Sequence, residues 1–294
     1  MDRGFGEVEL AQRLVPEGLL PVVEVATRAG DIPTLAAVTA GAVLVLERDR
    51  AIHYLGVVVG GFSLLAGLKA AFALSRPPVE LHLIETATTG FPSGHAMGAT
   101  LVFGGLALAL EVGSRRARVA AAAVPIAAAP LSRIVLGVHY LVDVVVGIGA
   151  AVGFLWAVER YARGDPARTL AVGAGVGLLA VAAGVVFGPT PRTACAGAVC
   201  LDRDAAVVGA AALGAFVAWR VVDRRSSSLD PAGRLFGATR TRTLSLVVLV
   251  PLLLGALLWV GSALLYVIVA AAVGAAVLVS LAGRGATVLD RFVE

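Results

Sequence analysis

Charged residues and cysteines are scarce in this chain of 294 residues. Only 15% of the residues are charged, whereas 59% are hydrophobic and the mean hydropathy is +0.91. Soluble domains carry about 25% charged residues, so this composition excludes a soluble globular protein. The two cysteines, Cys195 and Cys200, are too few for a disulfide scaffold. We expect them in an outer loop, either as one short-range disulfide or as free thiols.

The chain also lacks the gathered basic patch of a nucleic-acid-binding protein, although its formal net charge is +4. Its basic residues lie in short loops between apolar runs, and only one of them is a lysine. Basic residues in such loops mark the cytoplasmic side of membrane helices. We therefore expect the lipid bilayer as a partner, and no nucleic acid.

Long apolar runs are abundant, and they predict an all-α, polytopic transmembrane helical bundle. Many of them approach the ~20 residues that an α-helix needs to cross a bilayer. The expected spans are residues 32–47, 51–74, 95–113, 117–137, 139–159, 168–188, 205–222, 244–261 and 264–282. Small residues spaced four apart predict close packing between helices. These pairs are Gly56 and Gly60, Gly149 and Gly153, and Gly173 and Gly177.

Arginine sets the expected orientation of these spans, because most basic residues lie in alternate loops. These loops hold Arg48 and Arg50; Arg115, Arg116 and Arg118; Arg160, Arg163 and Arg168; and several arginines in the polar linker 220–243. An excess of arginine marks the cytoplasmic side. The loop before His95 and the junction near residues 130–139 are therefore expected to face the extracytoplasmic side.

Two cations lie at the outer end of the second expected span, in "KAAFALSRP". Lys69 and Arg76 are seven residues apart, about two helical turns, so we predict that both project from one helix face. Pro77 is expected to end that helix. Two cations at a helix end favour a bound anion, and the alternative is that they reach toward lipid headgroups.

A second stretch, "PSGH", precedes the third expected span. Ser93 is a good helix N-cap, and Gly94 lets a ligand approach the backbone. Free N–H groups at a helix N-terminus bind anions, so His95 would lie beside any anion bound there. The alternative is a simple cap with a histidine at headgroup level.

The third stretch is "SRIVLGVHYLVD", which adds the cation Arg133. His139 and Asp143 are four residues apart on an expected helix, so they should share a face. An aspartate within a span suggests function. It can accept a hydrogen bond from one ring nitrogen of His139 and leave the other with a lone pair, as in an activated nucleophile. The alternative is a structural pair between helices.

The three stretches should converge at the outer ends of neighbouring spans. Together they hold three cations, two histidines and one carboxylate. A single carboxylate argues against a magnesium site. Two histidines and an aspartate suit zinc, but three cations favour a bound phosphate instead. We therefore predict a phosphate site without a metal or another cofactor.

In this order and spacing, the three stretches resemble the type 2 phosphatidic acid phosphatase superfamily, to which soluble haloperoxidases are related. The resemblance covers residues 69–143 and implies a six-helix phosphatase-like core with additional C-terminal transmembrane helices. It implies that His139 attacks phosphorus, Asp143 orients His139, and His95 protonates the leaving oxygen. It also implies a phosphate-binding set consisting of Lys69, Arg76, Ser93, Gly94 and Arg133, and no metal.

These expectations divide the chain into three parts. Residues 1–31 lack the basic start and clean apolar core of a signal peptide and predict an amphipathic segment at the membrane interface. Residues 32–164 form the expected catalytic core, and residues 165–294 form C-terminal transmembrane helices of unassigned role.

The expected function is hydrolysis of a membrane lipid phosphate or diphosphate, such as phosphatidic acid, phosphatidylglycerol phosphate or a polyprenyl diphosphate. The enzyme would lie in the cell membrane and act through a phosphohistidine. One alternative is a phosphotransferase or lipid headgroup transferase that uses the same site. Another is a transporter or scaffold that binds lipid or phosphate without cleaving it. No oligomeric state is predicted.

Overall fold

The computed structural model describes residue 4 and residues 6–86, 88–187, 190–191, 193–196 and 199–226. This part of the chain is a bundle of helices with one short β-hairpin. Its elements are α1 (Glu7–Leu14), η1 (Glu17–Leu19), α2 (Leu20–Thr27), η2 (Arg28–Gly30), α3 (Ile32–Val45), α4 (Arg48–Phe72), η3 (Val79–Leu81), α5 (Gly94–Ala99), η4 (Thr100–Gly104), α6 (Gly105–Ala109), α7 (Arg115–Val135), α8 (Leu141–Ala162), α9 (Pro166–Val186), β1 (Thr193–Ala196), β2 (Val199–Asp202) and α10 (Arg203–Ser226).

The first seven predicted spans each coincide with a helix to within a few residues, and α5, η4 and α6 together form the third. Four described helices, α4, α7, α8 and α9, are long and apolar enough to cross a membrane. A fifth is counted if Glu17–Gly30 and Ile32–Val45, which meet at 50°, form one broken span. The chain is therefore an all-α, membrane-embedded protein. The predicted spans 244–261 and 264–282, and the linker beyond Ser226, lie outside the described residues.

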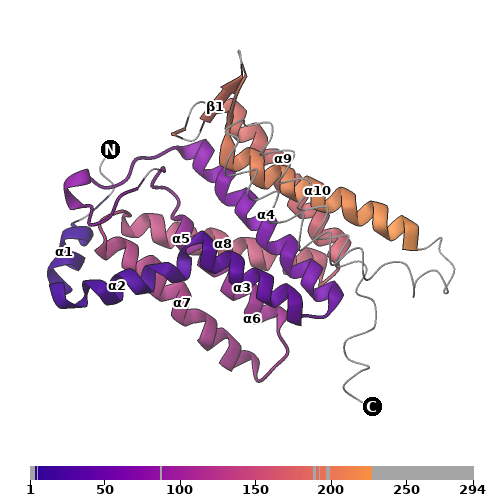
Figure 1. The fold of residues 1–294 in the computed structure, drawn as a ribbon, viewed down its shortest axis with the longest axis horizontal. Helices are drawn as coiled ribbons and strands as arrows, with labels where there is room; N and C mark the ends of the chain where they lie inside the picture. Colours follow the sequence, from indigo (N-terminus) through magenta and orange to yellow (C-terminus); the bar gives the residue numbers. More distant parts are fainter. Residues whose placement is uncertain are drawn as a thin grey trace.

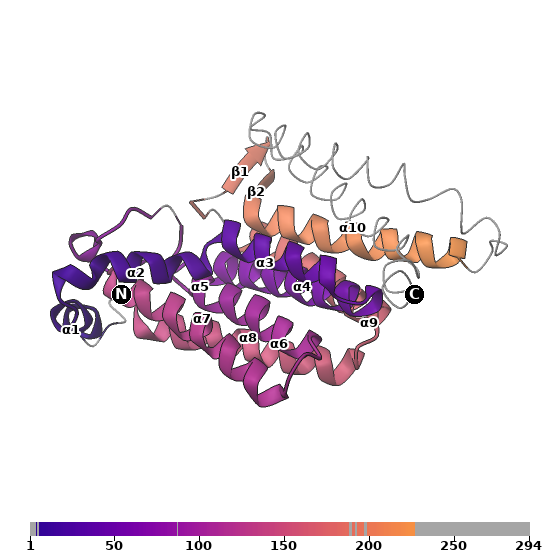
Figure 2. The same ribbon diagram turned by 60° about the horizontal axis from the view of Figure 1, so that its bottom comes forward.

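The helices pack as two groups that share α4. Helices α4, α9 and α10 lie side by side, while α5 packs against α7 and α8 (Figures 1 and 2). Buried side chains of α4, such as Val57 and Leu65, join Met97, Leu101 and Phe154 in one apolar core between the groups. Residues beyond 165 thus pack directly on the predicted catalytic core, and the division at residue 165 stays a prediction.

The N-terminal segment lies against the C-terminal end of α7 rather than apart from the bundle. Val8 of α1 is buried in a cluster with Ile134 and Tyr140. The side chain of Gln12 donates hydrogen bonds to the carbonyl groups of Leu81, at 2.8 Å, and Val135, at 3.1 Å. The predicted position of this segment at the membrane interface stays a prediction.

Small residues allow α4, α9 and α10 to approach closely, as predicted for two of the three glycine pairs. A Cβ atom added at Gly60 would lie 3.0 Å from the Cα of Gly173, and one at Gly177 would lie 3.1 Å from the Cα of Gly209. For Gly149 and Gly153 the described residues show no such close approach, and the prediction stays a prediction. Within the described part of the chain, no atom lies within 4 Å of a Cβ at either position.

The loops at the end of the bundle where α4 and α7 end make tight backbone contacts. Gly137 has a φ of 76°, and a Cβ there would overlap the carbonyl oxygen of Leu81, so only glycine fits this approach. The amide of Leu83 donates to the carbonyl of Leu136 at 3.0 Å. Farther along the chain, Cys195 and Cys200 face each other across the β1–β2 hairpin and form a disulfide. Of the two predicted alternatives, a disulfide or two free thiols, the structure has the disulfide.

We predict that Gly60→Leu destabilises the bundle and that Gly153→Leu does not. The leucine at residue 60 must displace Gly173 of α9 or the ring of Phe154, and such overpacking typically costs about 1–3 kcal/mol. At residue 153 the side chain meets no described neighbour, so the free energy of unfolding should change little. Thermal unfolding of both variants in detergent measures the difference. Equal melting temperatures would contradict the packing of α4 on α9.

Candidate active site

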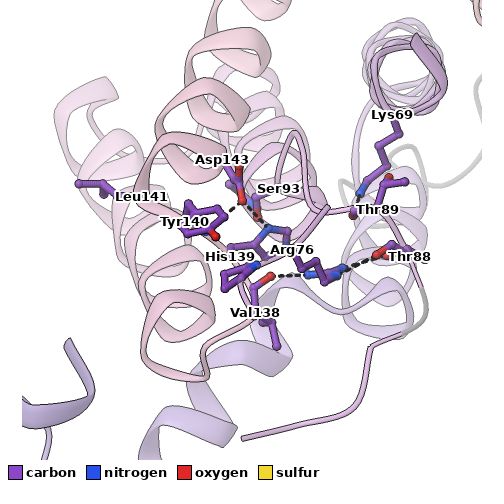
Figure 3. A network of polar contacts seen from close by, with 12 residues as sticks. Lys69, Arg76, Thr88, Thr89, Ser93, Val138, His139, Tyr140, Leu141 and Asp143 are labelled. Carbon is purple, nitrogen blue, oxygen red and sulfur yellow. Dashed lines mark hydrogen bonds and ion pairs between the residues drawn. The ribbon is translucent and has the colours of Figure 1, made fainter. Parts of the chain in front are cut away.

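The three motif stretches meet at one end of the bundle, where α4 ends, α5 begins, and α7 connects to α8 (Figure 3). Lys69 lies in the last turn of α4 and Arg133 in the last turn of α7. Asp143 lies in the first turn of α8. The loop from residue 73 to residue 92 brings Arg76 back across this end. Side chains that are far apart in the sequence therefore surround one place.

Arg76 connects the first stretch to the third. Its Nη1 donates to the carbonyl of Val138 at 2.6 Å and contacts Nε2 of His139 at 3.1 Å. On its other side, Nε donates to the carbonyl of Thr88 at 2.8 Å, and Nη2 donates to the hydroxyl of Thr88 at 2.9 Å. The guanidinium is thus held from both sides in one orientation (Figure 3).

The prediction that Lys69 and Arg76 share a helix face is wrong. Helix α4 ends at Phe72, and Ala73 has a left-handed φ of 45°, which redirects the chain before Arg76. Lys69 instead donates from Nζ to the carbonyl of Thr89 at 2.8 Å. Both cations therefore donate hydrogen bonds to residues 88–89, although Lys69 lies on α4 and Arg76 lies in the loop that follows it.

His139 is nearly fully buried, and its contacts determine which ring nitrogen carries the proton. An arginine can only donate hydrogen bonds. Nε2, facing Nη1 of Arg76, must therefore hold a lone pair, and the proton of the neutral ring lies on Nδ1. Nδ1 is 3.4 Å from Oδ2 of Asp143. The lone pair of Nε2 thus points toward the cations.

The environment also keeps this ring neutral. Burial first, and then repulsion by Arg76 and Arg133, holds the pKa of His139 well below its usual value of 6.5. Burial, followed by repulsion from Arg133, lowers the pKa of Arg76 to about 10. At neutral pH the histidine is therefore unprotonated and the guanidinium is charged, as a nucleophile beside a phosphate-binding cation requires.

His139 and Asp143 do not share a helix face, because α8 begins only at Leu141. His139 lies in the turn before the helix. The Asp143 carboxylate reaches back toward this turn, and its Oδ2 accepts from the amide of Tyr140 at 2.9 Å. The predicted pair is therefore brought together by a helix N-terminus rather than by helical spacing.

Ser93 connects the second stretch to the third. Its amide donates to the backbone carbonyl of Asp143 at 3.0 Å. A Cβ at Gly147 would lie 2.9 Å from the carbonyl oxygen of Ser93, so this glycine lets α8 approach the start of α5. The predicted N-cap is present, because the Ser93 hydroxyl accepts from the amide of Ala96 at 3.4 Å. Gly94 faces the stem of Lys69, whose Cε would lie 3.7 Å from an added Cβ.

Sequence reasoning missed residues from the N-terminal segment that contact this site. Nε2 of His95 is 2.8 Å from Oδ1 of Asp31. Nη1 of Arg133 donates to the hydroxyl of Thr27 at 3.2 Å. Asp31 and Thr27 lie 64 and 106 positions before these partners, and no local pattern in the sequence relates residues so far apart.

The site is chemically suited to an anion of high charge. Arg133 is buried, and Lys69 and Arg76 are half-buried, beside one histidine with a directed lone pair. Planar guanidinium groups match the oxygens of a phosphate. Among the residues that the structure describes, no three histidine, cysteine, aspartate or glutamate side chains are grouped as metal ligands.

Comparison with known proteins places this site within a family. Residues 50–165 match the model of the PAP2 superfamily. No curated protein and no solved structure matches the chain. The matched region runs from α4 to the end of α8 and contains every residue of the three stretches. Residues 50–165 of this membrane-embedded chain are therefore similar to the PAP2 superfamily, whose members are phosphatases that act on phosphoesters.

Proposed function

We propose that the chain is a membrane phosphatase that hydrolyses a lipid phosphate or diphosphate through a phosphohistidine at His139. The observation that carries this proposal is the contact between Nη1 of Arg76 and Nε2 of His139, at 3.1 Å. A phosphoryl oxygen bound by Arg76 lies beside the lone pair of Nε2. The residue that binds the anion therefore also presents it to the nucleophile.

In the first half-reaction, Nε2 of His139 forms a bond to phosphorus while the bond from phosphorus to the leaving oxygen breaks. Nδ1 keeps its proton, and the negative charge of Asp143, whose Oδ2 lies 3.4 Å away, stabilises the positive ring as it forms. His95 donates a proton to the leaving oxygen, which departs as an alcohol or, from a diphosphate, as a phosphate.

In the second half-reaction, water attacks phosphorus and the bond from phosphorus to Nε2 breaks. His95, now unprotonated, accepts the proton from this water. The site then releases inorganic phosphate, and both histidines return to their starting states. One histidine thus serves as acid in the first step and as base in the second.

The cations provide the electrostatic stabilisation in both steps. Lys69, Arg76 and Arg133 are held by neighbouring oxygen atoms before any substrate binds, and they require little rearrangement as charge develops on the phosphoryl oxygens. The amide groups at the start of α5, beyond Ser93, add a positive helix end. We propose that these charges do the work that a metal ion does in other phosphatases.

A lipid substrate is supported by the apolar surface beside the site. Leu131 near the end of α7 and Leu141 at the start of α8 are 55% and 45% exposed, close in sequence to Arg133 and His139. Exposed leucines in this position suit contact with acyl or prenyl chains at the membrane boundary. Phosphatidic acid, phosphatidylglycerol phosphate and polyprenyl diphosphates are the candidate classes.

We predict that the purified chain releases phosphate from at least one lipid of these classes in excess EDTA. His139→Asn should reduce the rate by about a thousandfold or more, because loss of a nucleophile removes the covalent route. His82→Asn, which changes a histidine in the outer loop, should retain most of the activity. Phosphate release from a lipid panel in detergent measures all three proteins.

Two results would contradict the proposal in different ways. Activity that EDTA abolishes would make the histidines metal ligands rather than nucleophile and acid. Transfer of the phosphoryl group to an added lipid alcohol, with little free phosphate, would favour the transferase alternative. Binding of lipid phosphate without turnover would favour the transporter or scaffold.

We also propose that the site faces the extracytoplasmic side of the cell membrane. The arginine-rich ends of the described helices lie opposite the site: α4 and α7 begin with Arg48 and Arg115, and both end at the site. Helices α8 and α9 meet at the arginine-rich end, between Arg160 and Arg168. The positive-inside rule then puts the site outside.

Cysteine labelling tests this orientation. We predict that Glu80→Cys, in the exposed loop near the site, reacts with a membrane-impermeant maleimide in intact cells. Arg116→Cys, exposed at the opposite end, should react only after the membrane is permeabilised. The unchanged chain provides the background, since its two cysteines form a disulfide. The reverse labelling pattern would put the site on the cytoplasmic side.

A further inference from the structure

The carboxylate of Asp31 lies against His95, the residue to which the mechanism assigns the acid role. Oδ1 of Asp31 is 2.8 Å from Nε2 of His95. The two residues are 64 positions apart, so the contact depends on the tertiary fold. Asp31 lies outside the region that matches the family model, because that region begins at residue 50.

Asp31 occupies the N-cap position of α3, yet its side chain does not cap the helix. Aspartate at this position normally accepts a hydrogen bond from an amide of the first helical turn. Elsewhere in the described bundle such caps are made: Ser93, Ser114 and Asp165 each accept from the first turn of their own helix. The Asp31 carboxylate is therefore directed to His95 in place of a stabilising local bond.

The backbone beside Asp31 is also shaped around the ring of His95. A Cβ atom added at Gly30 would lie 2.7 Å from Cδ2 and 2.9 Å from Cβ of His95. Only a residue without a side chain leaves room for the ring at this place. About one turn earlier, Thr27 accepts from Arg133 at 3.2 Å, so the same segment also contacts a phosphate-binding cation.

The charges around His95 explain why a carboxylate is needed there. Burial first, and then the positive charges of Arg133 in α7 and Arg76 in the loop after α4, act against the charged form of His95. Such neighbours favour the neutral form of a histidine. An acid must hold its proton until the leaving oxygen takes it. Asp31 is the one carboxylate that contacts His95 in the described part of the chain.

We propose that Asp31 is a positioning residue that accepts the Nε2 proton of His95, so that the proton delivered to the leaving oxygen lies on Nδ1. This inference rests on the proposed phosphatase function. As the bond from phosphorus to the leaving oxygen breaks, the Nδ1 proton passes to that oxygen, and the Nε2 proton stays in the bond to Asp31. The neutral ring then accepts a proton from the attacking water at Nδ1.

The test compares two substrates that differ in their need for an acid. Dioctanoyl phosphatidic acid has an alkoxide leaving group that must be protonated, whereas 4-nitrophenyl phosphate releases a stable phenolate. The first turnover of the purified full chain is measured by rapid quench for wild type, Asp31→Asn and Asp165→Asn. Asp165→Asn is the matched control, because this aspartate is also an N-cap but lies at the far end of the bundle.

We expect Asp31→Asn to slow the first turnover of the phosphatidic acid by roughly tenfold to a hundredfold, a part of the usual contribution of an acid. The rate with 4-nitrophenyl phosphate should change by less than about twofold. The fall in rate at high pH should also move to lower pH, because removing the carboxylate lowers the pH at which His95 loses its proton. Asp165→Asn should resemble wild type in all three respects.

A second variant keeps the inference testable if Asp31→Asn folds poorly. Gly30→Ala retains the carboxylate but forces the His95 ring away from it, so it should produce the same substrate-selective loss. Equal losses with both substrates, or no loss with either, would overturn the role of Asp31 and leave the proposed function intact. Absence of phosphate release by wild type from both substrates and from every lipid of the panel above would overturn the proposed function and this inference together.

Discussion

The burial of three cations at one end of the bundle is the constraint on which the rest of the site depends. Like charges out of water destabilise a fold unless oxygen atoms surround them. Here backbone carbonyls supply those oxygens: Thr88 and Val138 accept from Arg76, and Thr89 accepts from Lys69. Those carbonyls are available to accept these bonds only because the loop of residues 73–92 and the turn before α8 are irregular. The irregular backbone therefore supplies the oxygen atoms that stabilise the charged side chains.

The tight packing of the helices places these loops. Gly147 lets α8 approach Ser93, and Gly137 lets the turn before His139 contact the loop at Leu81. A side chain at either position would move a charged group away from its partner. In a membrane, where helices gain little from hydrophobic burial against each other, close contact of small residues is also a main source of association. The same glycines thus serve both the bundle and the site.

Much of this arrangement was predictable from local patterns in the sequence. The helices follow from apolar runs, and the cap at Ser93 follows from its residue type and position. The prediction that Lys69 and Arg76 share a helix face was wrong because Ala73, in a left-handed conformation, ends the helix before Arg76. Alanine gives no signal for that conformation. Asp31 was missed because its partner, His95, is set by tertiary packing. Local sequence patterns carry no information about a contact between residues 64 positions apart.

The proposed function requires a covalent bond between His139 and phosphorus, and the most direct experiment is to trap that phosphoenzyme. The chain would be mixed with its best lipid phosphate carrying ³²P, quenched within milliseconds in alkali, and analysed by denaturing electrophoresis and peptide mass spectrometry. We expect a phosphoenzyme that is stable in alkali and labile in acid, that maps to His139, and that is missing from His139→Asn. Full turnover without labelled protein, or a phosphoryl group on a residue other than His139, would contradict it.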